Sequence, residues 1–166
     1  YGLESEVEGY PALGERQEIA RRAEGRLAEM APVFEAGNRS LLVEHYPEAA
    51  RCFDHVGQVF PSREILNNSG VARVLEALKL STGVRFAYPV ELDAQTRLRR
   101  GGKSRSPRDE ERRLQLLEQG RALFDQARAK DPGYTTAYVN LACAVVLLGQ
   151  HAEAISWGEQ GMEIAK

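Results

Sequence analysis

The chain has 166 residues, of which 43% are apolar and 28% are charged, a composition typical of a folded globular domain and not of a disordered or fibrous chain. Its 22 Lys and Arg residues against 24 Asp and Glu residues leave a formal charge of −2, so no net field attracts it to nucleic acid or to an acidic membrane. Since no stretch approaches the roughly 20 apolar residues that span a bilayer, we predict neither nucleic acid nor membrane as a partner.

The cysteines and the first residue bear on where the protein works. Cys52 and Cys143 both fall in apolar helical patterns, where a thiol behaves as a small hydrophobe, and two cysteines cannot form a disulfide framework. This favours a cytoplasmic location and leaves the periplasm open. The chain starts at Tyr1 without a signal-like apolar run, which predicts that it is a piece of a longer polypeptide.

The first third of the chain is predicted to contain a tail and a helix. Residues 1–12 are rich in glutamate and are expected to be a solvated tail or linker. Residues 13–30 show apolar side chains at helical spacing, Ile19 and Ala23 among them, and are predicted to form an amphipathic N-terminal helix. Pro32 follows, and because proline removes a helical hydrogen bond we expect the helix to break there; one kinked helix through the proline is the alternative.

Two patterns of small residues recur along the rest of the chain. The small residues are Gly37, Gly70 and Ala142 in the first pattern, and Ala49, Gly120 and Ala154 in the second. After Ala49 and after Gly120, a phenylalanine follows four residues later and a proline twelve residues later. The distance from Gly37 to Gly70 is 33 residues and that from Gly120 to Ala154 is 34. A fixed period of this length indicates stacked helical hairpins.

The motif Ala-Tyr-Val-Asn-Leu-Ala at 137–142, followed by Leu-Gly-Gln-His-Ala-Glu-Ala-Ile at 148–155, resembles the tetratricopeptide repeat (TPR) family. Most of residues 29–166 share the resemblance, although Ser69 stands where leucine is usual and Lys166 where the closing proline would be. The resemblance implies an all-α fold, in which three helix pairs form a right-handed superhelical stack after the N-terminal helix.

We expect residues 13–166 to be one domain, in which the three repeats follow the N-terminal helix at 13–30. Their predicted bounds are 31–61, 62–132 and 133–166. The second repeat is longer, because 50 residues separate Gly70 from Gly120 where the other repeats have 12. We therefore predict a long loop insertion at about 81–108. Phe86 and Tyr88 lie in its first half, and two aromatic side chains on a loop need cover, so we expect that half to fold back on the repeat helices.

Motifs for chemistry are lacking. The sequence contains no HExxH, no paired CxxC and no glycine-rich phosphate loop. No histidine stands at a motif spacing that would activate Cys143. We therefore predict a protein that is not an enzyme, with no catalytic residue, no metal site and no cofactor.

The resemblance implies a binding surface instead, because the first helix of each pair lines the concave side of such a stack. The residues expected on this groove are Phe34, Asn38, Leu41, Glu64, Asn67, Asn68, Val71, Val74, Thr136, Val139, Asn140, Cys143 and Val146. Asparagines recur there, and an amide can pair with both polar groups of one peptide unit. Packing between repeats is an equally good reason for Asn68 and Asn140. No Lys or Arg stands among these positions, so a clamp for a C-terminal carboxylate is not predicted.

From these patterns we expect a protein interaction module, which binds a peptide segment or a partner domain in the groove. One alternative is a regulatory or substrate-recruiting segment of a larger bacterial multidomain enzyme, such as a hydrolase or protease; another is a structural spacer. The last helix, 152–166, has no following helix to cover Ile155, Met162 and Ile164. The exposure of these apolar side chains predicts contact with further sequence or self-association with a second copy.

Overall fold

A computed structural model describes residues 13–80 and 106–166 of the chain, with the backbone alone for residues 13–20. The described residues form α-helices and no strand, which confirms the predicted all-α class. The helices are α1 (Leu13–Leu42), α2 (Tyr46–Val59), α3 (Arg63–Leu80), α4 (Pro107–Lys130), α5 (Thr135–Leu147) and α6 (His151–Ile164). The chain divides into two units at Pro32, and the helices from Val33 onward belong to the second unit.

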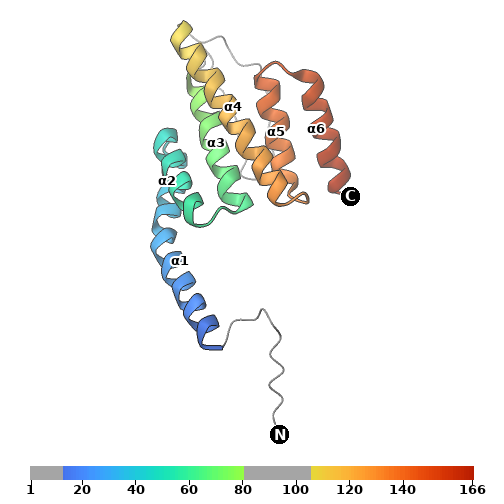
Figure 1. Ribbon diagram of the computed structural model, residues 1–166. Helices are drawn as coiled ribbons and strands as arrows, with labels where there is room; N and C mark the ends of the chain where they lie inside the picture. The colour runs from blue at the N-terminus through green and yellow to red at the C-terminus, as the bar shows by residue number, and fades with distance from the viewer. Residues whose placement is uncertain (1–12, 81–105) are drawn as a thin grey trace. The chain divides into compact units, whose positions relative to one another are not determined.

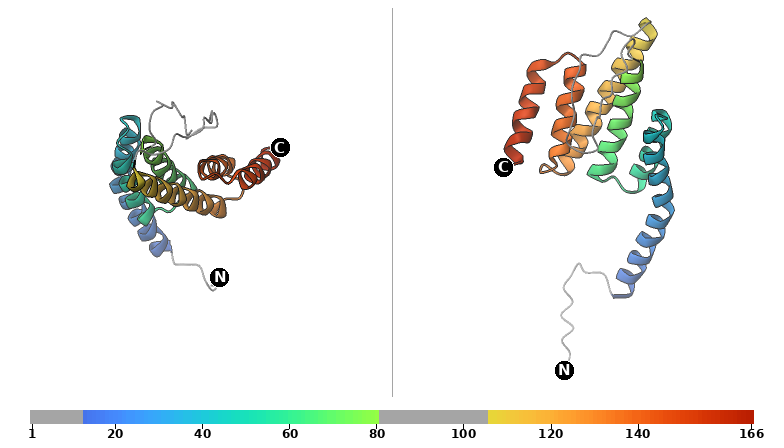
Figure 2. Two further views of the ribbon diagram at one scale, coloured as in Figure 1. Left: turned by 90° about the horizontal axis from the view of Figure 1, so that it is seen from above. Right: turned by 180° about the vertical axis from the view of Figure 1, so that it is seen from behind.

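Successive helices of the second unit lie side by side. Helix α2 packs on α3, α3 on α4, α4 on α5, and α5 on α6, as Figure 1 and Figure 2 show. Short turns join α2 to α3, α4 to α5 and α5 to α6, and a short turn returns the chain antiparallel to the helix before it. Each helix from α3 to α5 is thus enclosed by the helices that precede and follow it in the sequence.

The turns and helix ends follow from local residue chemistry. The hydroxyl of Ser106 accepts a hydrogen bond from the backbone N–H of Asp109 at 3.1 Å, and Pro107 occupies the first turn of α4, where its missing N–H has no cost. This cap starts α4 at Pro107, close to residue 108, the approximate end of the predicted insertion. Gly149, between α5 and α6, has a φ of 83°, a conformation that glycine adopts without strain.

Pro32 does not end a helix. Helix α1 continues from Leu13 to Leu42 with Pro32 inside it, so the predicted break is wrong and the alternative of one helix through the proline holds. The proline lacks one hydrogen-bond donor, a cost of about 3 kcal/mol in a helix interior. Residues 1–12 and 81–105, on which the predicted tail and the fold-back of Phe86 and Tyr88 fall, lie outside the described residues.

Close approach of helices at glycines forms the core. A Cβ added to Gly37 would lie 2.9 Å from the ring of Phe53, and one added to Gly70 would lie 2.6 Å from the ring of Phe124. Gly120 is equally tight, because its added Cβ would lie 2.7 Å from Val74 Cγ2. Each phenylalanine is fully buried. Helices α2 and α4 therefore place an aromatic ring where α1 and α3 have a glycine and no side chain.

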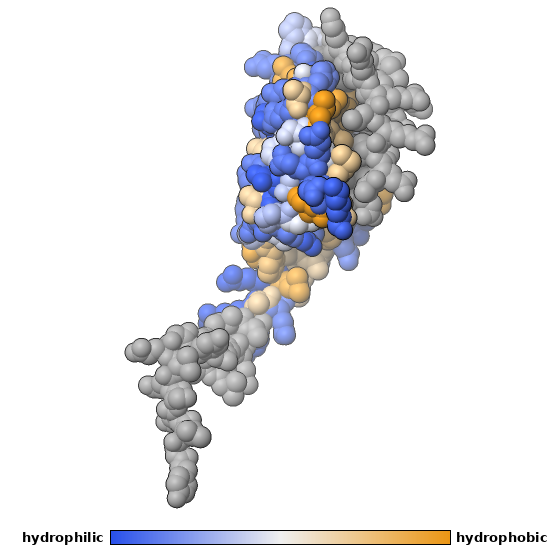
Figure 3. Space-filling view, turned by 90° about the vertical axis from the view of Figure 1, so that its right-hand side faces the viewer, coloured by the Kyte–Doolittle hydropathy of each residue, from blue (hydrophilic) through white to orange (hydrophobic). Residues whose placement is uncertain are grey.

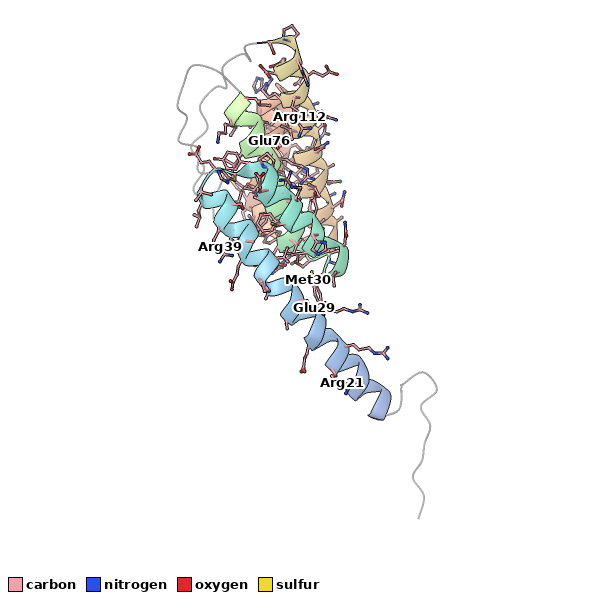
Figure 4. The ribbon with its side chains drawn as sticks, turned by 90° about the vertical axis from the view of Figure 1, so that its left-hand side faces the viewer. Arg21, Glu29, Met30, Arg39, Glu76 and Arg112 are labelled. Atoms are coloured by element: carbon pink, nitrogen blue, oxygen red, sulfur yellow. The ribbon has the colours of Figure 1, made fainter. Side chains whose placement is uncertain are left out.

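Polar side chains add links between neighbouring helices. Arg73 on α3 donates to the Asp54 carboxylate of α2 at 2.6 Å and to the hydroxyl of Ser69 at 2.6 Å, while that hydroxyl donates to Asp54. This cluster explains why a serine stands at position 69. One turn further along α3, Arg112 of α4 donates to Glu76 at 3.1 Å, and Figure 4 labels both residues.

Two glycine substitutions test this packing. Replacement Gly70→Ala drives a methyl group into the buried ring of Phe124 and should lower the free energy of unfolding by about 1–3 kcal/mol. Replacement Gly158→Ala is the matched control, because an added Cβ on this α6 residue meets no described atom within 4 Å. It should raise stability by about 0.5–1 kcal/mol, the usual gain for glycine in a helix interior. Urea unfolding measures both, and a destabilised Gly158→Ala would contradict the described geometry.

Pro32 gives a second test. Replacement Pro32→Ala restores the missing amide donor and removes the ring from the helix, so amide hydrogens on the turns of α1 beside residue 32 should exchange several-fold more slowly. Hydrogen exchange followed by NMR measures this. Equal exchange in both proteins would show that the proline does not weaken α1.

Candidate functional site

The residues predicted to line a groove all lie on α1, α3 and α5. Two of them, Glu64 and Val139, are exposed. Five are half-buried: Phe34, Asn38, Leu41, Thr136 and Val146. Six are buried: Asn67, Asn68, Val71, Val74, Asn140 and Cys143. Most of these side chains are therefore less accessible to a ligand than the residues that line an open groove would be.

Several of these residues have clear packing roles. Val71 and Val74 belong to the core cluster that holds α3 against α4 and α5, together with Leu117 and Phe124. The two valines thus present no exposed surface. Phe34 on α1 meets Phe53 of α2 edge to face, with ring centroids 5.8 Å apart, a favoured aromatic arrangement. Sequence spacing alone could not separate these core contacts from ligand contacts, because both occur on the same helical faces.

The buried asparagines of α3 and α5 meet each other. The side-chain Nδ2 of Asn140 donates a hydrogen bond to Oδ1 of Asn67 at 2.7 Å. This bond joins α3 to α5 through two residues that are 73 positions apart in the sequence. Because the bond lies in the interior, it is stronger electrostatically than the same bond in water.

One hydrogen-bond donor and one acceptor of the asparagine pair have no partner among the described residues. Asn67 Nδ2 and Asn140 Oδ1 are buried and have no hydrogen-bond partner among the described residues. An unpaired buried polar atom costs about 1–3 kcal/mol. One peptide group carries a complementary C=O and N–H, so a single backbone unit could satisfy both atoms.

Charge at one end of α3 comes from a cluster that the sequence analysis missed. Arg63 Nε donates to the Glu64 carboxylate at 2.6 Å, and this hydrogen bond lowers the pKa of Glu64. Arg63 also pairs with Asp131 and lies over the ring of Tyr134 at 4.9 Å. It therefore joins the start of α3 to the turn between α4 and α5. No periodic pattern marks such a residue, since its partners come together only on folding.

Comparisons with known proteins give no match, either among models of protein families or among curated proteins. In residues 13–80 and 106–166, no helix is long and apolar enough to cross a membrane. The same residues contain no group of three or more His, Cys, Asp or Glu side chains placed to hold a metal ion.

The asparagine pair can be tested by substitution. Replacement Asn140→Ala removes the donor and leaves Asn67 Oδ1 buried without a partner, so it should cost about 1–3 kcal/mol of unfolding free energy. The double replacement Asn67→Leu with Asn140→Leu keeps the branched arrangement of side-chain heavy atoms and leaves no unpaired polar side-chain atom. It should cost less than the sum of the two single leucine variants. Guanidinium unfolding measures the cycle, and simple additivity would show that the two amides do not interact.

Proposed function

We propose that residues 33–166 form a tetratricopeptide-type stack of three helix pairs with a right-handed superhelical sense. The pairs are the end of α1 with α2, α3 with α4, and α5 with α6. Three features support this assignment: the period of 33 or 34 residues, the packing of each helix on its sequence neighbours, and the repeated contact of a phenylalanine with a glycine. In this arrangement the first helices α1, α3 and α5 share one side of the stack.

We infer that the protein is a non-catalytic interaction module that binds a peptide segment of a partner on this side. The unpaired donor of Asn67 and the unpaired acceptor of Asn140 carry the proposal, because an extended peptide supplies the complementary groups from its backbone. Exposed Glu64 and Val139 flank the pair on α3 and α5. They make the first contacts, and the buried amides are reached as neighbouring side chains move aside.

The ligand should be apolar or mixed in character. Glu64 is a carboxylate at neutral pH, and the hydrogen bond from Arg63 lowers its pKa further, so it disfavours a free carboxylate terminus beside it. Val139 offers an apolar contact on the next first helix. An internal peptide segment with apolar side chains satisfies both conditions. Affinities of about micromolar strength are expected for a small site that must order its ligand.

Selection from a displayed random-peptide library tests the proposal. Peptides that bind the intact chain should lose about tenfold or more in affinity for Val139→Arg, because the new charge occupies the apolar contact. The matched control is Leu114→Arg on α4, since Leu114 and Val139 are similarly exposed at 40% and 36%. The control variant should bind as the original chain does.

Two results would contradict the binding role. One is a chain that selects no peptide, which would favour a structural spacer. The other is a set of selected peptides that respond equally to Val139→Arg and Leu114→Arg, which would place binding away from the first helices. Circular dichroism on both variants confirms that each retains its helices before the affinities are compared.

A further inference from the structure

The outward face of α6 is an apolar surface that no described residue covers. Ile155 and Met162 are 63% and 65% exposed, which agrees with the exposure predicted from the sequence. They stand seven residues apart, so they share one helical face with Gly158 between them. Figure 3 views the α6 side and shows apolar side chains within a mostly hydrophilic surface. We call the surface formed by Ile155, Gly158 and Met162 the α6 face.

The repeat period shows what this face would contact. The 34-residue offset from Gly120 to Ala154 makes Ile155 and Met162 the equivalents of Arg121 and Arg128 on α4. Those two arginines contact α6: Arg121 donates to Glu153 at 2.8 Å, and Arg128 lies over the Trp157 ring at 5.2 Å. The α6 face thus occupies the position from which α4 contacts the side chains of another helix.

Gly158 adds a notch to the α6 face. Its equivalent on α4 is Phe124, whose buried ring fills the space beside Gly70. At Gly158 no ring is present, and an added Cβ would meet no described atom within 4 Å. A side chain from outside the chain can therefore enter beside α6, between Ile155 and Met162. A bulky apolar side chain fits this position best, because residues on both sides of it are apolar.

Charge around the face favours a basic partner over a second copy. Glu159 is exposed and follows Gly158 directly. A two-fold pairing of α6 with α6 that opposes Ile155 to Met162 would centre on Gly158 and Glu159. The two Glu159 carboxylates would then approach each other, and like charges at an interface oppose association. A lysine or arginine from a different helix would instead pair with Glu159.

We propose that the α6 face docks a helix of a partner protein, one with an apolar stripe of bulky side chains and basic residues beside that stripe. This site is separate from the peptide site proposed on α1, α3 and α5, and it does not depend on that function. The partner helix contacts Ile155 and Met162 at the positions where α4 contacts α6 through Arg121 and Arg128. A large apolar side chain of the partner enters the notch at Gly158.

A synthetic helix tests the proposal directly. The probe is a fluorescein-labelled peptide of about 18 residues, or roughly five helical turns, with leucines and one central phenylalanine on one stripe and lysines elsewhere. Its affinity for the full chain is measured by fluorescence anisotropy. The double variant Ile155→Ser with Met162→Ser should bind it about tenfold more weakly or worse. Gly158→Leu should also weaken binding, since the new side chain fills the notch.

Matched controls separate this proposal from its competitors. Leu114→Ser should leave the affinity for the probe within about twofold, because Leu114 lies on α4, away from the α6 face. The same peptide with glutamates in place of lysines should bind more weakly. Equal binding of the acidic peptide, or unchanged binding by the double variant, would overturn the proposal. So would sedimentation showing a dimer that dissociates in the double variant, because the occupant would then be a second copy.

Discussion

Close approach of neighbouring helices at glycine is the constraint on which the rest of this structure depends. Phe53 fits against Gly37 and Phe124 fits against Gly70, so each ring fills the space that a missing side chain leaves. Dispersion contacts fall off steeply with distance, and a ring held this closely gains far more than one spaced by a methyl group. These two contacts set the separation within the first two helix pairs. At the position of α6 equivalent to Phe124, 34 residues further along the sequence, stands Gly158, so no ring is present there.

Polar groups act on the alignment of the helices more than on their attraction. Asp54, Ser69 and Arg73 bind one another between α2 and α3, and Arg63 binds Asp131 at the end of α4. Partly exposed ion pairs contribute little net free energy in water. A cluster of directed hydrogen bonds nevertheless disfavours sliding of one helix past another, since any shift leaves several groups unpaired.

The two surfaces considered for binding differ in physical character. Between α3 and α5 the notable groups are Asn67 and Asn140, which are buried, polar and incompletely paired. On α6 the notable groups are apolar and open to solvent. A site of the first kind recognises backbone polar groups and gains from satisfying them, whereas one of the second kind gains from removing apolar area from water. The two proposed sites therefore call for ligands of different chemistry.

The sequence by itself determined the all-α class and most of the positions at which helices pair, because the spacing of small, aromatic and proline residues is a local property of the chain. The exposure of Ile155 and Met162 also followed from that spacing. Only the tertiary structure decided that α1 runs through Pro32, that Val71 and Val74 are core residues, and that Asn67 bonds with Asn140. The last two of these outcomes depend on groups far apart in the chain. Periodicity identifies the face on which a residue lies, but packing decides whether that face meets protein or ligand.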